Sequence, residues 1–219
     1  MITTFNPARE EILGNVRMAL GRRIDSPAPI VPSAARFGPR FPGDADVEME
    51  MLLSEIAKLG GFTQRVNRQT LRAALAELVR ASSVKQATVW DAAELKELNI
   101  AADLRELGVE LVSPQAGKRA LAECDLGLTG ADAALPETGT LLLRSAPDKA
   151  RAVSILPRIH LALVRPSALR PDLHQAFEEF KRDGCLIAIT GPSRTADIEL
   201  TVTIGVHGPK ALHVWALSN

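Results

Sequence analysis

The sequence contains no tyrosine, and aromatic residues make up only 4% of its 219 residues. Proteins that bind single-stranded nucleic acid stack bases on aromatic side chains, so this composition argues against such a surface. Basic and acidic residues are equal in number, at 26 each. No overall field therefore attracts the chain to nucleic acid or to an anionic membrane. No uncharged apolar run approaches the roughly 20 residues that a membrane-spanning helix needs.

Cysteine is also scarce, because only Cys124 and Cys185 are present and they lie far apart in the sequence. A cysteine-held zinc ion or iron–sulfur cluster needs about four ligands, which excludes either group within this chain alone. The start, MITTFNPAREE, lacks the cationic segment and apolar core of a signal peptide. Two isolated thiols without a secretion signal fit a reducing compartment, and we expect a cytoplasmic protein with no cofactor of its own.

Residues 1–43 are predicted to form an N-terminal arm. Ile12, Val16 and Leu20 recur every four residues, which indicates an amphipathic helix over residues 6–23. A proline-rich connector follows, and it is expected to be extended because a proline pushes the residue before it out of the helical region. The arm is expected to pack on a partner or on its own domain; the open alternative is a partly ordered tail.

Residues 44–219 alternate between helical and strand patterns, which predicts an α/β domain with a mostly parallel, Rossmann-like sheet covered on both faces. Strands are expected at residues 62–66, 87–90, 109–112, 126–129, 140–144, 159–164, 186–189 and 211–217. The clearest helices are expected at residues 44–59, 70–81 and 171–182. The strands at 126–129 and 140–144 are close in sequence, and we expect them to be antiparallel neighbours because a parallel return needs a longer connection.

The stretch from residue 185 to 217 organises the rest of the chain. The apolar run 186–189 ends in a Thr-Gly-Pro-Ser turn, and a second glycine turn at 205–209 precedes the last strand. Between the turns, Thr195 followed by Asp197 and Glu199 predicts the beginning of a helix, because free backbone N–H groups favour hydroxyl oxygen and negative charge. We expect both turns to lie at the carboxyl ends of strands, where open α/β sheets bind ligands.

Four motifs in this order resemble the LUD domain family, and within it the lactate utilisation protein C (LutC) group. They are TGADAALPETGTLLL (129–143), LPRIH (156–160), GPSRTADIE (191–199) and GVHGP (205–209). The resemblance implies a sheet of the type shared by NagB, RpiA and CoA transferases. It also implies a role in oxidising L-lactate to pyruvate with two partner proteins, LutA-like and LutB-like, that carry the iron–sulfur clusters.

Three glycine-bearing loops, at residues 129–140, 190–195 and 205–209, are expected to converge into one pocket. Glycine lets backbone N–H groups approach an anion closely, so a small carboxylate or phosphate ligand fits these loops. The predicted ligand-binding residues are Thr129, Gly130, Thr138, Gly139, Thr140, Gly191, Ser193, Thr195, Asp197 and Gly208. The negative charge of Asp197 competes with a bound anion, and the alternative is that these are only tight turns with capping side chains.

Glu137 and His207 are the predicted catalytic residues. Glu137 lies between a proline and the Thr-Gly-Thr turn, and it acts as a base near neutral pH only if burial raises its pKa. His207 lies between two glycines, Gly205 and Gly208, and it is predicted to be an acid/base group or a ligand. For both residues, hydrogen bonding within the loop is the alternative. His160 begins a strand and is predicted to be structural. No metal-ligand spacing is present, and neither a P-loop nor a GxGxxG after a strand occurs.

Three functions remain open from the sequence. The first is an accessory subunit of a lactate-oxidising system. The second is a free-standing enzyme of the CoA-transferase or 5-formyltetrahydrofolate cyclo-ligase type, with Glu137 as the working carboxylate. The third is a regulatory or scaffold protein whose pocket is vestigial. Whether the chain forms a homo-oligomer is left open by the sequence.

Overall fold

The computed structural model describes residues 7–21, 40–182, 184–196, 202–205 and 208–218. The chain divides into two compact units, residues 1–38 and 39–219. In the first unit, α1 (Pro7–Ala19) carries the predicted stripe of Ile12 and Val16, and both side chains are exposed. None of the residues of α1 is buried.

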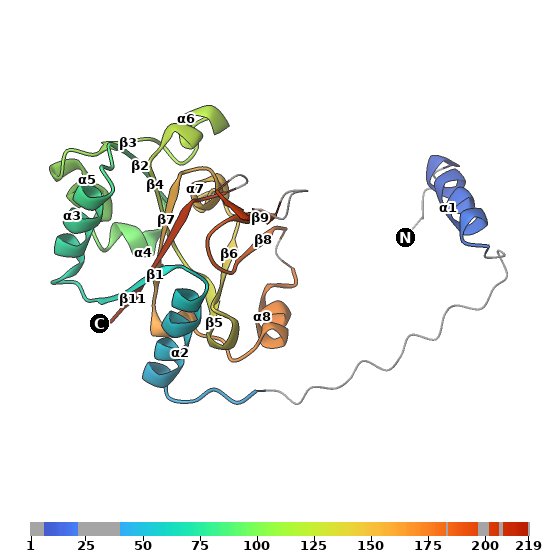
Figure 1. The fold of residues 1–219 in the computed structure, drawn as a ribbon, viewed down its shortest axis with the longest axis horizontal. Helices are drawn as coiled ribbons and strands as arrows, with labels where there is room; N and C mark the ends of the chain where they lie inside the picture. The colour runs from blue at the N-terminus through green and yellow to red at the C-terminus, as the bar shows by residue number, and fades with distance from the viewer. Residues whose placement is uncertain (1–6, 22–39, 183, 197–201, 206–207, 219) are drawn as a thin grey trace. The chain divides into compact units, whose positions relative to one another are not determined.

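A six-stranded parallel sheet forms the centre of the second unit, which confirms the predicted α/β fold with a mostly parallel sheet. The strand order is β1-β11-β7-β4-β2-β3, and every pairing in it is parallel (Figure 1). The strands are β1 (Phe62–Val66), β2 (Gln86–Val89), β3 (Glu110–Leu111), β4 (Leu126–Gly130), β7 (Ile159–Val164) and β11 (Ala211–Leu217). Strands β4 and β7 are buried along their whole length, as expected for a parallel sheet with both faces covered.

Helices cover this sheet on both faces. Figure 1 shows α3 and α5 on one face and α7 on the other. The helices of this unit are α2 (Ala45–Lys58), α3 (Leu71–Ala81), α4 (Ala93–Lys96), α5 (Ile100–Glu106), α6 (Lys118–Glu123), α7 (Ala152–Ile155) and α8 (Leu173–Phe180). Local signals set their ends: the Asp44 side chain accepts a hydrogen bond from the backbone N–H of Asp46 before α2, and Asp172 caps α8 in the same way through Gln175.

A second sheet of three antiparallel strands lies on the face that α7 covers (Figure 1). Its order is β5 (Ala133–Leu135), β6 (Thr140–Arg144) and β8 (Leu186–Ile189). The predicted antiparallel pairing of 126–129 with 140–144 is therefore wrong. The chain leaves the parallel sheet after Gly130, and the short strand β5 forms the antiparallel partner of β6 instead. Two 3₁₀ turns, η1 (Pro136–Thr138) and η2 (Pro166–Ala168), complete the unit.

A short antiparallel hairpin replaces the helix predicted to begin at Thr195. Strand β9 (Arg194–Ala196) pairs with β10 (Val202–Ile204), while residues 197–201 lie outside the described residues. Thr195 lies in β9, and Asp197 and Glu199 lie outside the described residues. The β-branched residues Val202, Thr203 and Ile204 favour a strand. Pairing with them places Thr195 in a strand rather than in a helix.

Helix α7 packs closely on one face of the parallel sheet, and a glycine lies beneath it. A Cβ atom on Gly127 would lie 1.9 Å from the carbonyl oxygen of Val153, so only glycine fits beneath α7. Gly127 pairs with His160 on β7, and His160 pairs with Leu212 on β11. Residues paired across a sheet point to the same face, so His160 and Leu212 point toward the layer that holds α7.

A candidate ligand site between the two sheets

A cavity of about 270 Å³ lies between the parallel sheet and the antiparallel sheet. Its floor includes His160 and Leu212 from the parallel sheet, and one wall is formed by Ile187 and Ile189 of β8. The remaining lining comes from Ser154, Ile155, Ala188, Thr190, Gly191, Pro192, Ser193, Gly208 and Pro209. The wall is thus mainly apolar, with a few polar groups, which is typical of sites for small molecules.

His160 is the one titratable side chain in this described lining, and it is only 1% exposed. Its Nε2 atom lies 2.8 Å from the hydroxyl oxygen of Thr129. Its Nδ1 atom has no hydrogen-bond partner among the described residues. Burial lowers the pKa of His160 to about 3, so the ring is neutral at physiological pH. A buried polar atom without a partner is costly, so the cavity is lined by a residue whose hydrogen-bonding capacity is only half used.

The loop after β8 and the segment before β11 meet at this cavity. The backbone N–H of Ser193 donates to the carbonyl oxygen of Pro209 at 3.1 Å, and the N–H of Gly205 donates to the carbonyl oxygen of Ser193 at 3.0 Å. A Cβ atom on Gly208 would lie 3.1 Å from Cβ of Ser193, so the two segments are in close contact. Two of the three predicted loops therefore converge as expected.

Their position relative to the sheet differs from the prediction. The loop that begins at Thr190 follows β8, a strand of the antiparallel sheet, and the loop with Gly208 precedes β11. Neither loop lies at the carboxyl end of a parallel strand. A four-residue apolar run such as 186–189 carries no information about which sheet it joins, so this could not be predicted.

The third predicted loop reaches the cavity through a chain of hydroxyl groups. Thr138 Oγ1 donates to Thr140 Oγ1 at 2.8 Å, and Thr140 Oγ1 lies 2.7 Å from Thr190 Oγ1. Thr190 is part of the cavity lining. Between them, Gly139 has a positive φ of 61°, and a Cβ atom there would lie 2.9 Å from the backbone nitrogen of Ile56. This glycine lets η1 pack against α2.

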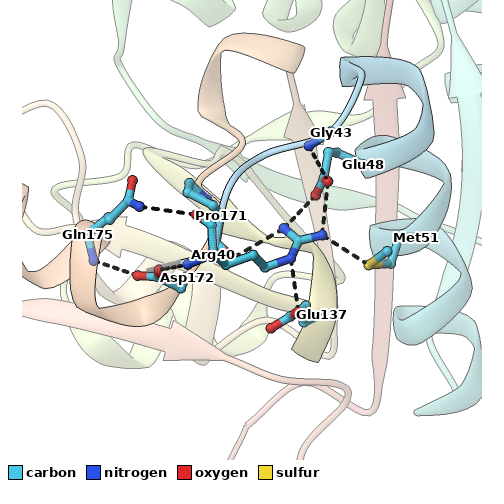
Figure 2. A network of polar contacts seen from close by, with 8 residues as sticks. All are labelled: Arg40, Gly43, Glu48, Met51, Glu137, Pro171, Asp172 and Gln175. Carbon is cyan, nitrogen blue, oxygen red and sulfur yellow. Dashed lines mark hydrogen bonds and ion pairs between the residues drawn. The ribbon is translucent and has the colours of Figure 1, made fainter. Parts of the chain in front are cut away.

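Glu137 lies in a different environment, which Figure 2 shows. Its Oε1 atom is 2.9 Å from Nε of Arg40, and its side chain is 57% exposed. The other two guanidinium nitrogens of Arg40 bind the two carboxylate oxygens of Glu48 at 2.8 and 2.9 Å. Glu48 is buried, and the hydrogen bond from Arg40 holds the pKa of Glu48 below its ordinary value. Asp172 accepts from the backbone N–H of Arg40, which joins α8 to the network.

The predicted site residues therefore fall into four groups. Gly191, Ser193 and Gly208 line the cavity, and Thr129 contacts it through His160. Thr138 and Thr140 contact it through Thr190, with Gly139 between them. Glu137 is not part of the described lining, and Gly130 lies beside Glu94 at the carboxyl end of β4. The side chain of Thr195 is not described, and Asp197 and His207 lie outside the described residues.

His160 was predicted to be structural, and its contact with Thr129 is compatible with that role, but the structure also places it in the lining of the candidate cavity. The available signal was its position in the LPRIH motif. The number of histidines gave no help, because four are present and none has ligand spacing. Within the described part of the chain, no group of three or more histidine, cysteine or acidic side chains is placed to hold a metal ion. The described helices include none with the length and apolarity that a membrane crossing requires.

The structure is a Rossmann-like α/β fold with a cavity between a parallel and an antiparallel sheet. Residues 49–217 match the sequence profile of the LUD domain. The chain belongs to the LUD domain family.

Two relatives match nearly the whole chain. It is 29% identical to a lactate utilization protein C of Shouchella clausii, over 94% of this chain and 96% of that protein. It is 27% identical to a protein of the same name from Halalkalibacterium halodurans, over 92% and 94%. The fold is similar to the crystal structure of a DUF162 family protein from Deinococcus radiodurans, with a TM-score of 0.59 and 22% identity, over 81% of this chain and all of that one.

Proposed function

We propose that this chain is a LutC-like component of an L-lactate utilisation system and that it binds a small carboxylate in the His160 cavity. The relatives named lactate utilization protein C, which match over nearly their whole length, support the role in lactate utilisation. The observation that carries the ligand site is the buried Nδ1 atom of His160, which has no partner among the described residues.

The chemistry of the cavity suits a short 2-hydroxy acid. A methyl group fits against Ile187, Ile189 and Leu212, while the ligand hydroxyl can pair with Nδ1 of His160. The carboxylate can accept a hydrogen bond from the hydroxyl of Ser193, because the backbone N–H of Ser193 is already bonded to Pro209. The described lining holds no lysine or arginine, so affinity rests on these hydrogen bonds, and a doubly charged phosphate is disfavoured.

Calorimetric titration with L-lactate and pyruvate tests the ligand site. We expect binding to wild-type protein, and we expect His160→Leu to weaken it by about tenfold or more because one buried hydrogen bond is lost. His174→Leu is the matched control, since His174 is exposed on α8. Ser193→Val provides a second variant at the opposite wall of the cavity. Equal affinity in wild type and in both cavity variants would remove the proposed site.

The proposal also assigns the electron-carrying iron–sulfur clusters to LutA-like and LutB-like partner proteins and places this chain in the cytoplasm. Both cysteines, Cys124 and Cys185, are free. We expect purified chain to oxidise L-lactate only after the partners are added. Turnover of L-lactate by the chain alone with an artificial electron acceptor would contradict the accessory role.

A free-standing enzyme of the CoA-transferase or cyclo-ligase type is the second candidate, although the Glu137 carboxylate is exposed and paired with Arg40, which argues against its use as a base near neutral pH. In that case ATP or CoA is expected to raise the melting temperature, and Glu137→Gln is expected to abolish turnover. Retained turnover in Glu137→Gln would dismiss this carboxylate as the catalytic group.

A further inference from the structure

The parallel sheet has a point at which the chain changes direction between neighbouring strands. Strand β3 lies on one side of β2, whereas β7 and then β11 lie on the far side of β4. The change of direction therefore falls between the neighbouring strands β2 and β4. In open α/β sheets such a point leaves a crevice at the carboxyl ends of the two strands, and ligands bind there. Trp90 follows β2 at this edge, and Ala131 and Asp132 follow β4.

A cavity of about 220 Å³ lies beside this position, at the carboxyl ends of β4 and β7 and against α4, and we call it the switch crevice. Leu95, Leu98 and Leu163 form its apolar wall. Its charged lining residues are Glu94, Asp132, Lys149 and Arg165. No described residue lines both the switch crevice and the His160 cavity, so the two are separate sites.

Both carboxylates of the switch crevice already have cationic partners. Oδ1 of Asp132 lies 2.7 Å from Nζ of Lys149 and 3.2 Å from Nε of Arg144, and its Oδ2 accepts from the backbone N–H of Arg144 at 2.8 Å. Glu94 lies 3.2 Å from Nζ of Lys149. Burial alone lowers the pKa of Lys149, but the hydrogen bond and charge of Asp132, with those of Glu94, raise it above its ordinary value. Lys149 therefore stays charged, and together with Arg144 it balances the two carboxylates of Asp132 and Glu94.

Arg165 is the cation that remains in the switch crevice. It follows the carboxyl end of β7 and is half-buried. Its one described polar contact runs from Nη2 to the backbone oxygen of Glu94, at 3.4 Å. No described carboxylate lies within ion-pair distance of its guanidinium group. A planar guanidinium group pairs with a carboxylate through two parallel hydrogen bonds, so the site offers one strong position for an anion.

We propose that the switch crevice binds a small organic monoanion, whose carboxylate pairs with Arg165 and whose apolar chain packs on Leu95, Leu98 and Leu163. One remaining cation matches one negative charge, so a dianionic phosphate is a poorer ligand there. The site is independent of lactate chemistry and of the His160 cavity, because it rests on other residues.

Calorimetric titration with propionate at low ionic strength tests the site. We expect Arg165→Gln to weaken propionate binding by about tenfold or more, because a charged hydrogen-bonded pair is lost. Arg68→Gln is the matched control: Arg68 also contacts a single backbone oxygen, that of Glu97, but it is exposed and lies outside the crevice.

Leu98→Phe provides a second test that keeps every charge, because it narrows the crevice from the apolar side. We expect it to weaken propionate binding while the unfolding transition shows a folded protein. Inorganic phosphate is the comparison probe and is expected to bind more weakly than propionate. Equal propionate affinity in wild type, Arg165→Gln and Leu98→Phe would overturn the proposal, as would tighter binding of phosphate.

Discussion

Nε2 of His160 and the hydroxyl oxygen of Thr129 lie 2.8 Å apart on adjacent strands, and both side chains are closed off from solvent. Thr129→Val keeps the shape of the side chain but removes the partner of Nε2, so both ring nitrogens are left unpaired. We expect the free energy of unfolding to fall by about 1–3 kcal/mol. Urea unfolding measures it. Thr63→Val on the edge strand β1 is the control, and an equal loss there would contradict a specific role for the pair.

The protein is expected to lose stability as the pH falls, beginning at pH values above those at which carboxylates titrate. Burial lowers the pKa of His160 to about 3 and that of His213 to about 4. In the unfolded chain both histidines have the ordinary pKa of about 6.5. Between these values the unfolded chain binds more protons, so stability is complete above pH 6.5 and is lost as pH falls toward 3–4.

Between pH 7 and pH 5, His160 alone is expected to lower the free energy of unfolding by roughly 2 kcal/mol. The partly exposed His213, which stacks on Phe62, contributes less. Urea unfolding at the two pH values measures the difference. His213→Phe should show a slightly smaller dependence on pH than wild type. Identical stability of wild type at pH 7 and pH 5 would show that His160 is not held neutral.

Gly127→Ala is expected to be among the most damaging small substitutions in the protein. The added methyl group would lie 1.9 Å from the carbonyl oxygen of Val153, so α7 must move away from the sheet. We expect a loss of about 3 kcal/mol or more of stability, at the upper end of the cost of overpacking. Gly117→Ala is the control because nothing lies within 4 Å of its Cβ position. Unfolding of the two variants by guanidinium compares them directly, and similar midpoints would contradict the tight contact.

Arg40 is expected to matter for stability far more than Glu137 does. Arg40→Met leaves the buried carboxylate of Glu48 without its cation, which we expect to cost about 3–5 kcal/mol. Glu137→Gln removes only an exposed pair, worth about 0–1 kcal/mol. The double variant Arg40→Met/Glu48→Met should recover much of the loss, because no unpaired charge remains. Chemical unfolding of the three variants measures their free energies of unfolding. Equal losses of stability in Arg40→Met and Glu137→Gln would contradict this order.

Elements with strong periodicity were predictable from the sequence. Leu71, Leu75 and Leu78 repeat with helical spacing, and all three are buried in α3. Strand β7 was predicted from the apolar run 159–164 and has the same bounds in the structure. In both cases the pattern records burial directly, since an element must turn its apolar residues toward the core.

Pairing between distant segments was not predictable. The three residues of β5 are too few to form a pattern, and without them β6 was assigned to the wrong neighbour. The position of His160 beneath the loop that contains Ser193 depends on how two sheets stack, which local sequence does not record. Glu137 was selected for its place beside a glycine turn, but its partner Arg40 comes from a segment nearly a hundred residues earlier.

Strand β11 lies between β1 and β7, although β1 is the first strand of the sheet to be synthesised and β11 the last. During translation β1 cannot pair with β11, its one neighbour among the described strands, until nearly the whole domain has emerged from the ribosome. Contacts between such remote segments slow folding. A nascent chain that ends before residue 211 therefore leaves the backbone hydrogen-bonding groups of β1 without the strand that pairs with them.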